Sequence, residues 1–76
     1  MKVCHIGNLN RFFEIVDKCE GKVELVTEQG DCLNLHSKIS QFVVLVKIVT
    51  DYNIQQGNIV SYNRKDTERL LKYIKQ

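Results

Sequence analysis

Residues 22–37, KVELVTEQGDCLNLHS, contain the pattern that decides the fold. Within residues 22–27 and again within residues 31–35, apolar side chains alternate with polar or charged ones. Such alternation is typical of strands that bury one face. The polar segment between them contains Gly30, the residue that tight hairpin turns favour. The stretch therefore predicts a β-hairpin with strands at 22–27 and 31–35.

Helical periodicity lies on both sides of this hairpin. Residues 9–20 form an amphipathic pattern, and Asn8 suits an N-cap before it. Near the end of the sequence, Asn63 can cap a last helix, with Asp66 placed where a carboxylate complements the helix dipole. The apolar positions of the first helix are Leu9, Phe12, Phe13, Val16 and Cys19, and those of the last are Leu70, Leu71 and Ile74.

Residues 38–50 allow two interpretations. Their β-branched and apolar composition would also suit a buried strand over residues 41–49. The length of the segment and a possible cap at Ser37 favour a helix, with a loop beginning at residues 50–51. On that helix, one face would supply the core contacts, from Ile39, Phe42, Val43, Val46 and Val49.

The same helix would then carry surplus apolar residues. Val44, Leu45 and Ile48 lie on the side opposite the proposed core face. Apolar residues all round a helix of a small domain indicate that another surface covers them. We therefore predict that these three residues contact a protein partner or a second copy of the chain. The alternatives are burial within the monomer, or a strand in place of the helix.

Two further strands complete the predicted topology, at residues 2–6 and 58–62. Residues 1–76 are then one α+β domain with the order β-α-β-β-α-β-α. We expect an open-faced sandwich, in which three helices cover one face of a four-stranded antiparallel sheet.

This order, together with two stretches, resembles HPr, the histidine-containing phosphocarrier family of the bacterial sugar phosphotransferase system. Residues 22–37 are similar to the family's central hairpin and its serine-started helix. Residues 57–71, GNIVSYNRKDTERLL, are similar to its last strand, polar turn and acidic helix start. The resemblance implies an HPr-like fold, a bacterial cytoplasmic location, and Enzyme I or sugar-specific phosphotransferase components as partners.

The phosphoacceptor loop departs from the family's pattern, which is Gly-Leu-His-x-Arg-Pro. Residues 6–11 read IGNLNR here and contain neither the histidine nor the proline. His5 is a weak candidate phosphoacceptor, because it precedes a predicted helix N-terminus that has Arg11 in its first turn. The favoured interpretation makes His5 an ordinary solvent-facing strand residue.

Ser37 matches the position of the regulatory serine that some HPr proteins carry at the start of the second helix. A phosphate there would accept hydrogen bonds from free backbone N–H groups. Ser37 is therefore a candidate site of regulatory phosphorylation, although a plain N-cap accounts for the same residue.

The amino-acid composition argues against several classes of protein. With 43% hydrophobic and 26% charged residues the chain is globular, and a net charge of +2 does not indicate nucleic-acid binding. No apolar run reaches the roughly 18 residues that a membrane span needs, and the first residues contain no apolar stretch long enough to predict a signal peptide. Three cysteines in no metal-binding spacing predict free thiols, no metal and no cofactor.

The sequence therefore predicts a cytoplasmic, non-enzymatic, HPr-like protein-binding or regulatory domain without the usual histidine phosphotransfer. One alternative is an active phosphocarrier that uses an atypical histidine. The other is a small oligomerisation domain unrelated to sugar transport.

Overall fold

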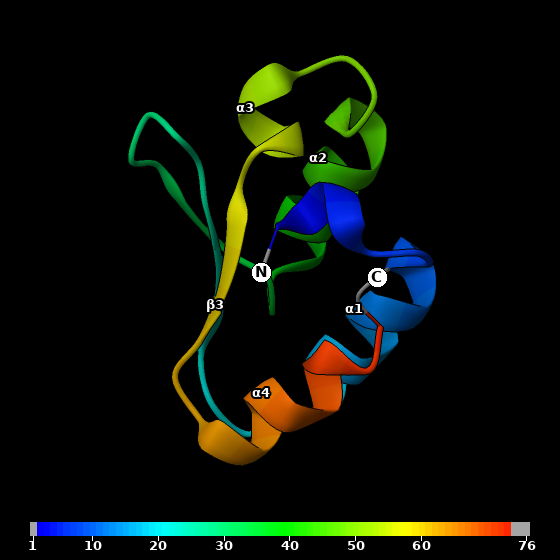
Figure 1. The fold of residues 1–76 in the computed structure, drawn as a ribbon, viewed down its shortest axis with the longest axis vertical. Coiled ribbons are helices and arrows are strands. Elements are labelled where there is room, and N and C mark those ends of the chain that lie inside the picture. The colour runs from blue at the N-terminus through cyan, green and yellow to red at the C-terminus, as the bar shows by residue number, and fades with distance from the viewer. Residues whose placement is uncertain (1, 74–76) are drawn as a thin grey trace.

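The computed structural model describes residues 2–73, which form a small α+β domain. Three antiparallel strands lie in the order β2-β1-β3. Helices α1, α2 and α4 lie on one side of this sheet (Figure 1). The elements in chain order are η1 (Val3–His5), α1 (Leu9–Lys18), β1 (Val23–Val26), β2 (Cys32–Asn34), α2 (Lys38–Lys47), α3 (Tyr52–Gln55), β3 (Asn58–Ser61) and α4 (Arg64–Leu71).

The predicted hairpin is confirmed. Strands β1 and β2 pair antiparallel with Leu25 opposite Leu33. The turn closes through a hydrogen bond from the Thr27 N–H to the Asp31 carbonyl, at 2.8 Å. Gly30 has a φ of +89°, a left-handed conformation that side chains with a Cβ rarely adopt. The glycine is therefore required by the turn itself.

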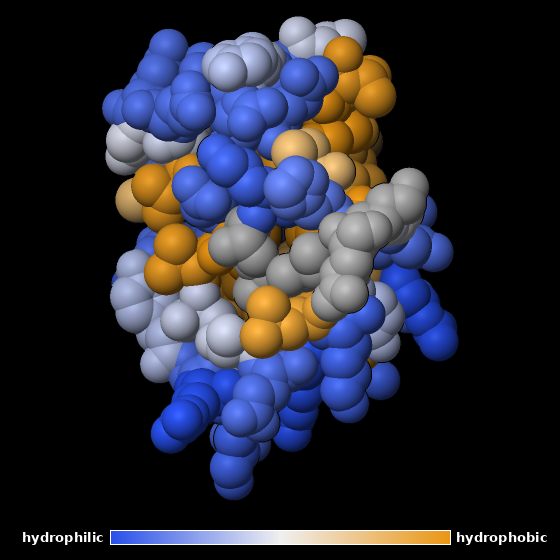
Figure 2. Space-filling model, in the orientation of Figure 1, coloured by the Kyte–Doolittle hydropathy of each residue, from blue (hydrophilic) through white to orange (hydrophobic). Residues whose placement is uncertain are grey.

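The first and last helices also form where the periodicity places them. The Asn8 side chain accepts a hydrogen bond from the Arg11 N–H at 3.1 Å, and Asn63 accepts from Lys65 and Asp66. These are N-caps, which satisfy backbone donors that a helix cannot pair internally. Polar residues cover the end of the molecule near α4 (Figure 2). Leu70 is buried as predicted, Leu71 is half exposed, and Ile74 lies outside the described residues.

The predicted first strand is wrong. Lys2 forms one isolated bridge with Asn58, and the chain then turns into the 3-10 helix η1. The reason is the spacing of the apolar side chains. Val3 and Ile6 are both buried, and residues three apart share one face of a 3-10 turn but opposite faces of a strand. The sheet accordingly has three strands among residues 2–73.

A short helix occupies part of the predicted loop after α2. Asp51 caps α3 by accepting a hydrogen bond from the Asn53 N–H at 2.9 Å. The turn of helix places Ile54 in the core. Gly57 follows it at a close approach, because a Cβ there would lie 2.4 Å from the Leu25 Cδ1 atom.

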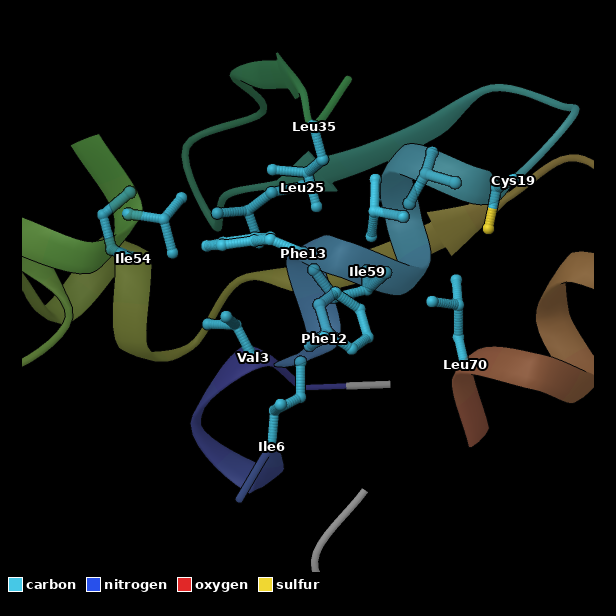
Figure 3. Packing of buried hydrophobic residues seen from close by; sticks show 13 residues of the cluster. Val3, Ile6, Phe12, Phe13, Cys19, Leu25, Leu35, Ile54, Ile59 and Leu70 are labelled. Atoms are coloured by element: carbon cyan, nitrogen blue, oxygen red, sulfur yellow. The ribbon is translucent and has the colours of Figure 1, made fainter. Parts of the chain in front are cut away.

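The core lies between the sheet and the helices. Phe12 and Phe13 of α1 pack at its centre with their rings 6.0 Å apart in an edge-to-face arrangement (Figure 3). Strand β1 contributes Val23 and Leu25, and β3 contributes Ile59 from the neighbouring strand. The core cluster further includes Val3, Ile6, Val16, Cys19, Leu35, Val44, Ile54 and Leu70.

Candidate functional site

The outward side of α2 and of the turn after it carries four apolar side chains, which we call the α2 stripe: Ile39, Phe42, Val46 and Val49. Ile39 is 78% exposed, Phe42 67%, Val46 55% and Val49 77%. Hydrophobic atoms gather over α2 at the upper right of the molecule (Figure 2). Contiguous exposed apolar surface of this kind marks interaction sites on soluble proteins.

The structure reverses the predicted faces of α2. The residues of the α2 stripe were expected in the core. Val44 was expected at a partner contact, yet it is fully buried, and Ile48 is half-buried against the core. Leu45 lies at the edge of the stripe with 37% exposure. Val44 and Ile48 therefore take part in the monomer's own packing, whereas Leu45 is exposed.

Gln41 explains the reversal. This side chain is buried on the inward face, three residues before Val44. Its Nε2 donates to the Leu35 carbonyl at 2.7 Å and to the Asp17 carboxylate at 2.9 Å. Because both amide hydrogens have acceptors, burial of this polar group costs little. A satisfied glutamine thus turns α2 so that the apolar stripe faces outward.

Asp17 of α1 links the two helices at this point. Its carboxylate also forms an ion pair with the Lys38 Nζ at the start of α2. The hydrogen bond from Lys38, followed by that from Gln41, lowers the pKa of the Asp17 carboxyl below its usual value. The carboxylate therefore stays charged at neutral pH and anchors the end of α2 nearest the hairpin.

His5, the candidate phosphoacceptor, is exposed at the end of η1. Its ring makes no hydrogen bond with any residue between 2 and 73. Arg11 was the cation expected to serve it, and the Arg11 guanidinium pairs with Glu14 at 3.6 Å. The Asn8 side chain caps the adjacent helix N-terminus. The predicted strand does not form around His5, and its role as a phosphoacceptor stays untested.

Ser37 is the N-cap of α2. Its Oγ accepts a hydrogen bond from the Ser40 N–H at 3.4 Å, and its carbonyl accepts from the Gln41 N–H at 3.0 Å. The capping interpretation is confirmed. Regulatory phosphorylation of Ser37 stays a prediction.

His36, the second histidine of the sequence, lies just after β2. Its half-buried ring places Nε2 at 2.9 Å from the Gly21 carbonyl. Because a carbonyl only accepts, Nε2 carries the proton in this contact. The hydrogen bond ties the end of β2 to the loop that leads into β1.

Asp66, which the sequence placed only in the first turn of the last helix, also makes contacts with the end of α1. It is buried, and its carboxylate accepts hydrogen bonds from the Gly21 N–H at 2.8 Å and from the Glu20 N–H at 3.4 Å. These contacts fasten the end of α1 to the start of α4. A Cβ at Gly21 would lie 2.8 Å from the Asn63 Cβ, so this approach requires glycine. Burial, followed by the negative charge of Asp66, raises the pKa of the Cys19 thiol to about 11.

Other kinds of site have no counterpart in the part of the chain that the structure describes. Residues 2–73 contain no group of three or more histidine, cysteine, aspartate or glutamate side chains able to hold a metal ion, and they enclose no pocket. None of the helices there has both the length and the apolar character needed to cross a lipid bilayer. The exposed apolar face of α2 is thus the feature on which a function can be built.

Comparison with known proteins does not assign the chain to a family. No family model, curated protein or solved structure matches the chain. The resemblance to HPr stays a prediction from the sequence.

Proposed function

We propose that the protein is a non-enzymatic protein-binding domain whose contact surface is the α2 stripe. This proposal rests on the exposure of four apolar side chains along one side of α2 and of the turn after it. The stripe presents on the order of 500 Å² of apolar surface, close to the upper end of what a typical monomer exposes. Water contact with that area is unfavourable, and a partner surface would remove it.

The construction of α2 supports this use. The helix is held in a defined orientation by the buried Gln41 and by the Asp17–Lys38 ion pair. A rigid element presents a binding surface at lower entropic cost than a mobile loop does. Phe42 lies within the stripe as a large aromatic residue, the type that dominates binding energies at interfaces.

Site-specific photocrosslinking tests the proposal. Benzoylphenylalanine would replace Phe42 in one variant and Tyr62 in a matched control, in the cells that naturally produce the protein. Tyr62 is 63% exposed, and its hydroxyl donates to Glu24 at 2.8 Å. Glu24 alternates with the buried residues of β1, so this control samples the sheet face turned away from the helices. We expect a discrete protein adduct from position 42 alone, weakened by Val46→Lys. Equal yields from both positions would refute the proposal.

In its narrower form, the proposal places the domain in the cytoplasm as a regulator linked to the sugar phosphotransferase system. Its support is the sequence resemblance to HPr, together with three free cysteines, which suit a reducing compartment. The loop before α1 lacks the family's phosphoacceptor motif, so we expect no efficient phosphorylation of His5.

Incubation with Enzyme I and phosphoenolpyruvate, followed by intact mass measurement, tests this narrower form. We expect a protein of unchanged mass. Rapid phosphate uptake that disappears in His5→Ala would establish the alternative, an active phosphocarrier with an atypical histidine.

A further inference from the structure

Ile39, Phe42 and Val46 lie on α2 and Val49 in the turn that follows it, and together they have the spacing with which two helices pack against each other. Ile39, Phe42, Val46 and Val49 are separated by three, four and three residues. This is the alternation of the a and d positions of a coiled coil, in which side chains of one helix fill gaps on the other. We infer that the stripe is covered by the same stripe of a second copy, so that two chains form a twofold dimer through α2. This inference rests on the proposed function and names its partner.

The charge distribution suits a second copy. The α2 segment contains no acidic residue, and its only charged side chains, Lys38 and Lys47, lie at its two ends. Lys38 is already paired with Asp17 of its own chain. Joining two stripes would therefore bury no charge and leave the lysines at the rim, where interfaces are polar. An identical patch can be self-complementary about a twofold axis without opposing like charges at its centre.

The exposed area of the stripe, when covered completely, reaches the lower end of the range for specific interfaces. About 500 Å² on each chain gives an interface of roughly 1,000 Å² in total, which is the lower bound for a specific protein–protein contact. Leu45, at the edge of the stripe, and half-buried Val43 would extend it. Phe42, near the middle, would be the anchor, because large aromatic residues close to the centre of an interface carry most of its binding energy. An interface of this size predicts reversible dimerisation that depends on protein concentration.

Sedimentation equilibrium of the full chain tests the dimer. We expect a monomer–dimer equilibrium with a dissociation constant below about 1 mM. For Phe42→Ser we expect this constant to be at least about tenfold higher. Tyr62→Ser removes an equally exposed aromatic ring from the sheet face and should change the constant by less than about twofold. A chain that stays monomeric at 1 mM, or a dimer that Phe42→Ser does not weaken, would overturn the inference. Circular dichroism of both variants would verify that each stays folded.

The mass of the crosslinked adduct distinguishes the dimer proposal from the more general proposal of a protein-binding domain. With benzoylphenylalanine at position 42, an adduct with the mass of two chains supports the dimer. An adduct with a different protein overturns the dimer and leaves the proposed function standing. If position 42 gives no more adduct than position 62, both proposals fail.

Discussion

Two valines two residues apart on α2 offer a direct comparison of its faces. Val44 is fully buried, whereas Val46 is 55% exposed. Replacing either valine with alanine makes the same chemical change in the same helix. Alanine also improves helix propensity by the same amount at both positions, about 0.6 kcal/mol. The difference between the two variants therefore reports burial alone.

The expected magnitude follows from the packing. Val44→Ala removes two buried carbon groups, worth about 1.6 kcal/mol of transfer free energy, and leaves a cavity that adds about 1 kcal/mol. After the gain in helix propensity, the net loss of unfolding free energy is about 2 kcal/mol. For Val46→Ala, the partial loss of burial and the propensity gain nearly cancel, so the change should stay within about 0.5 kcal/mol.

Urea unfolding followed by circular dichroism would measure both changes, at protein concentrations below the dimer dissociation constant. A difference of about 2 kcal/mol corresponds to roughly 30-fold in the folding equilibrium, well outside the error of the method. Equal losses for the two variants, or a larger loss for Val46→Ala, would refute the assignment of the inward face. The reasoning about Gln41 would fail with it.

Two further variants and one labelling experiment test other contacts of the fold. Asp66→Ala should cost about 3 kcal/mol in urea unfolding, because it leaves the Gly21 and Glu20 N–H groups without their acceptor, whereas a loss below about 1 kcal/mol would contradict the role of Asp66. The pKa of the Asp17 carboxyl is lower in the folded protein than its ordinary value of 3.8, so the charged carboxylate stabilises the fold. This contribution to the free energy of unfolding is complete above pH 3.8 and disappears as the pH falls through the pKa of the folded state. Wild type should therefore exceed Asp17→Asn by up to about 1 kcal/mol at pH 7 and by nothing near pH 2, and a difference that does not change with pH would exclude this contribution. Cys19, with its pKa raised to about 11, should react with a thiol reagent at pH 8 far more slowly than the exposed Cys4 and Cys32, and three equal rates would show that it is not buried.

Local signals were enough for much of the fold. The hairpin was predictable because alternation and a glycine turn coincide in residues 22–37, and the structure confirms both strands. Helices α1 and α4 were predictable because asparagine caps precede clear periodicity. The strand prediction for residues 2–6 failed because buried Val3 and Ile6 are three residues apart, a spacing that suits a 3-10 turn and not the alternation of a strand. The loop prediction after α2 missed α3, whose four residues are too few to show a period.

The face of α2 could not be deduced from periodicity. The helix is apolar on nearly every side, so its pattern points weakly in any direction. The deciding interaction joins Gln41 to Leu35 and to Asp17, and the latter is 24 residues distant in the sequence. A glutamine is usually assigned to the surface, and only tertiary contacts reveal that its amide is satisfied inside. The sequence therefore predicted the helix itself but assigned its inward and outward faces the wrong way round, and a contact surface on α2 stays a prediction.

The α2 stripe points outward, and we propose that protein covers it. Methyl NMR with a soluble paramagnetic probe measures both parts, because the probe relaxes only methyl groups that solvent reaches. In dilute solution we expect strong relaxation of the Ile39, Val46 and Val49 methyls and none of Val44. At high protein concentration, relaxation of the stripe methyls should fall while that of an exposed Leu71 methyl stays constant. Strong relaxation of the Val44 methyls would contradict the outward orientation of the stripe. Cover by protein would be contradicted if the stripe methyls stay fully accessible both at high protein concentration and in the presence of any crosslinked partner.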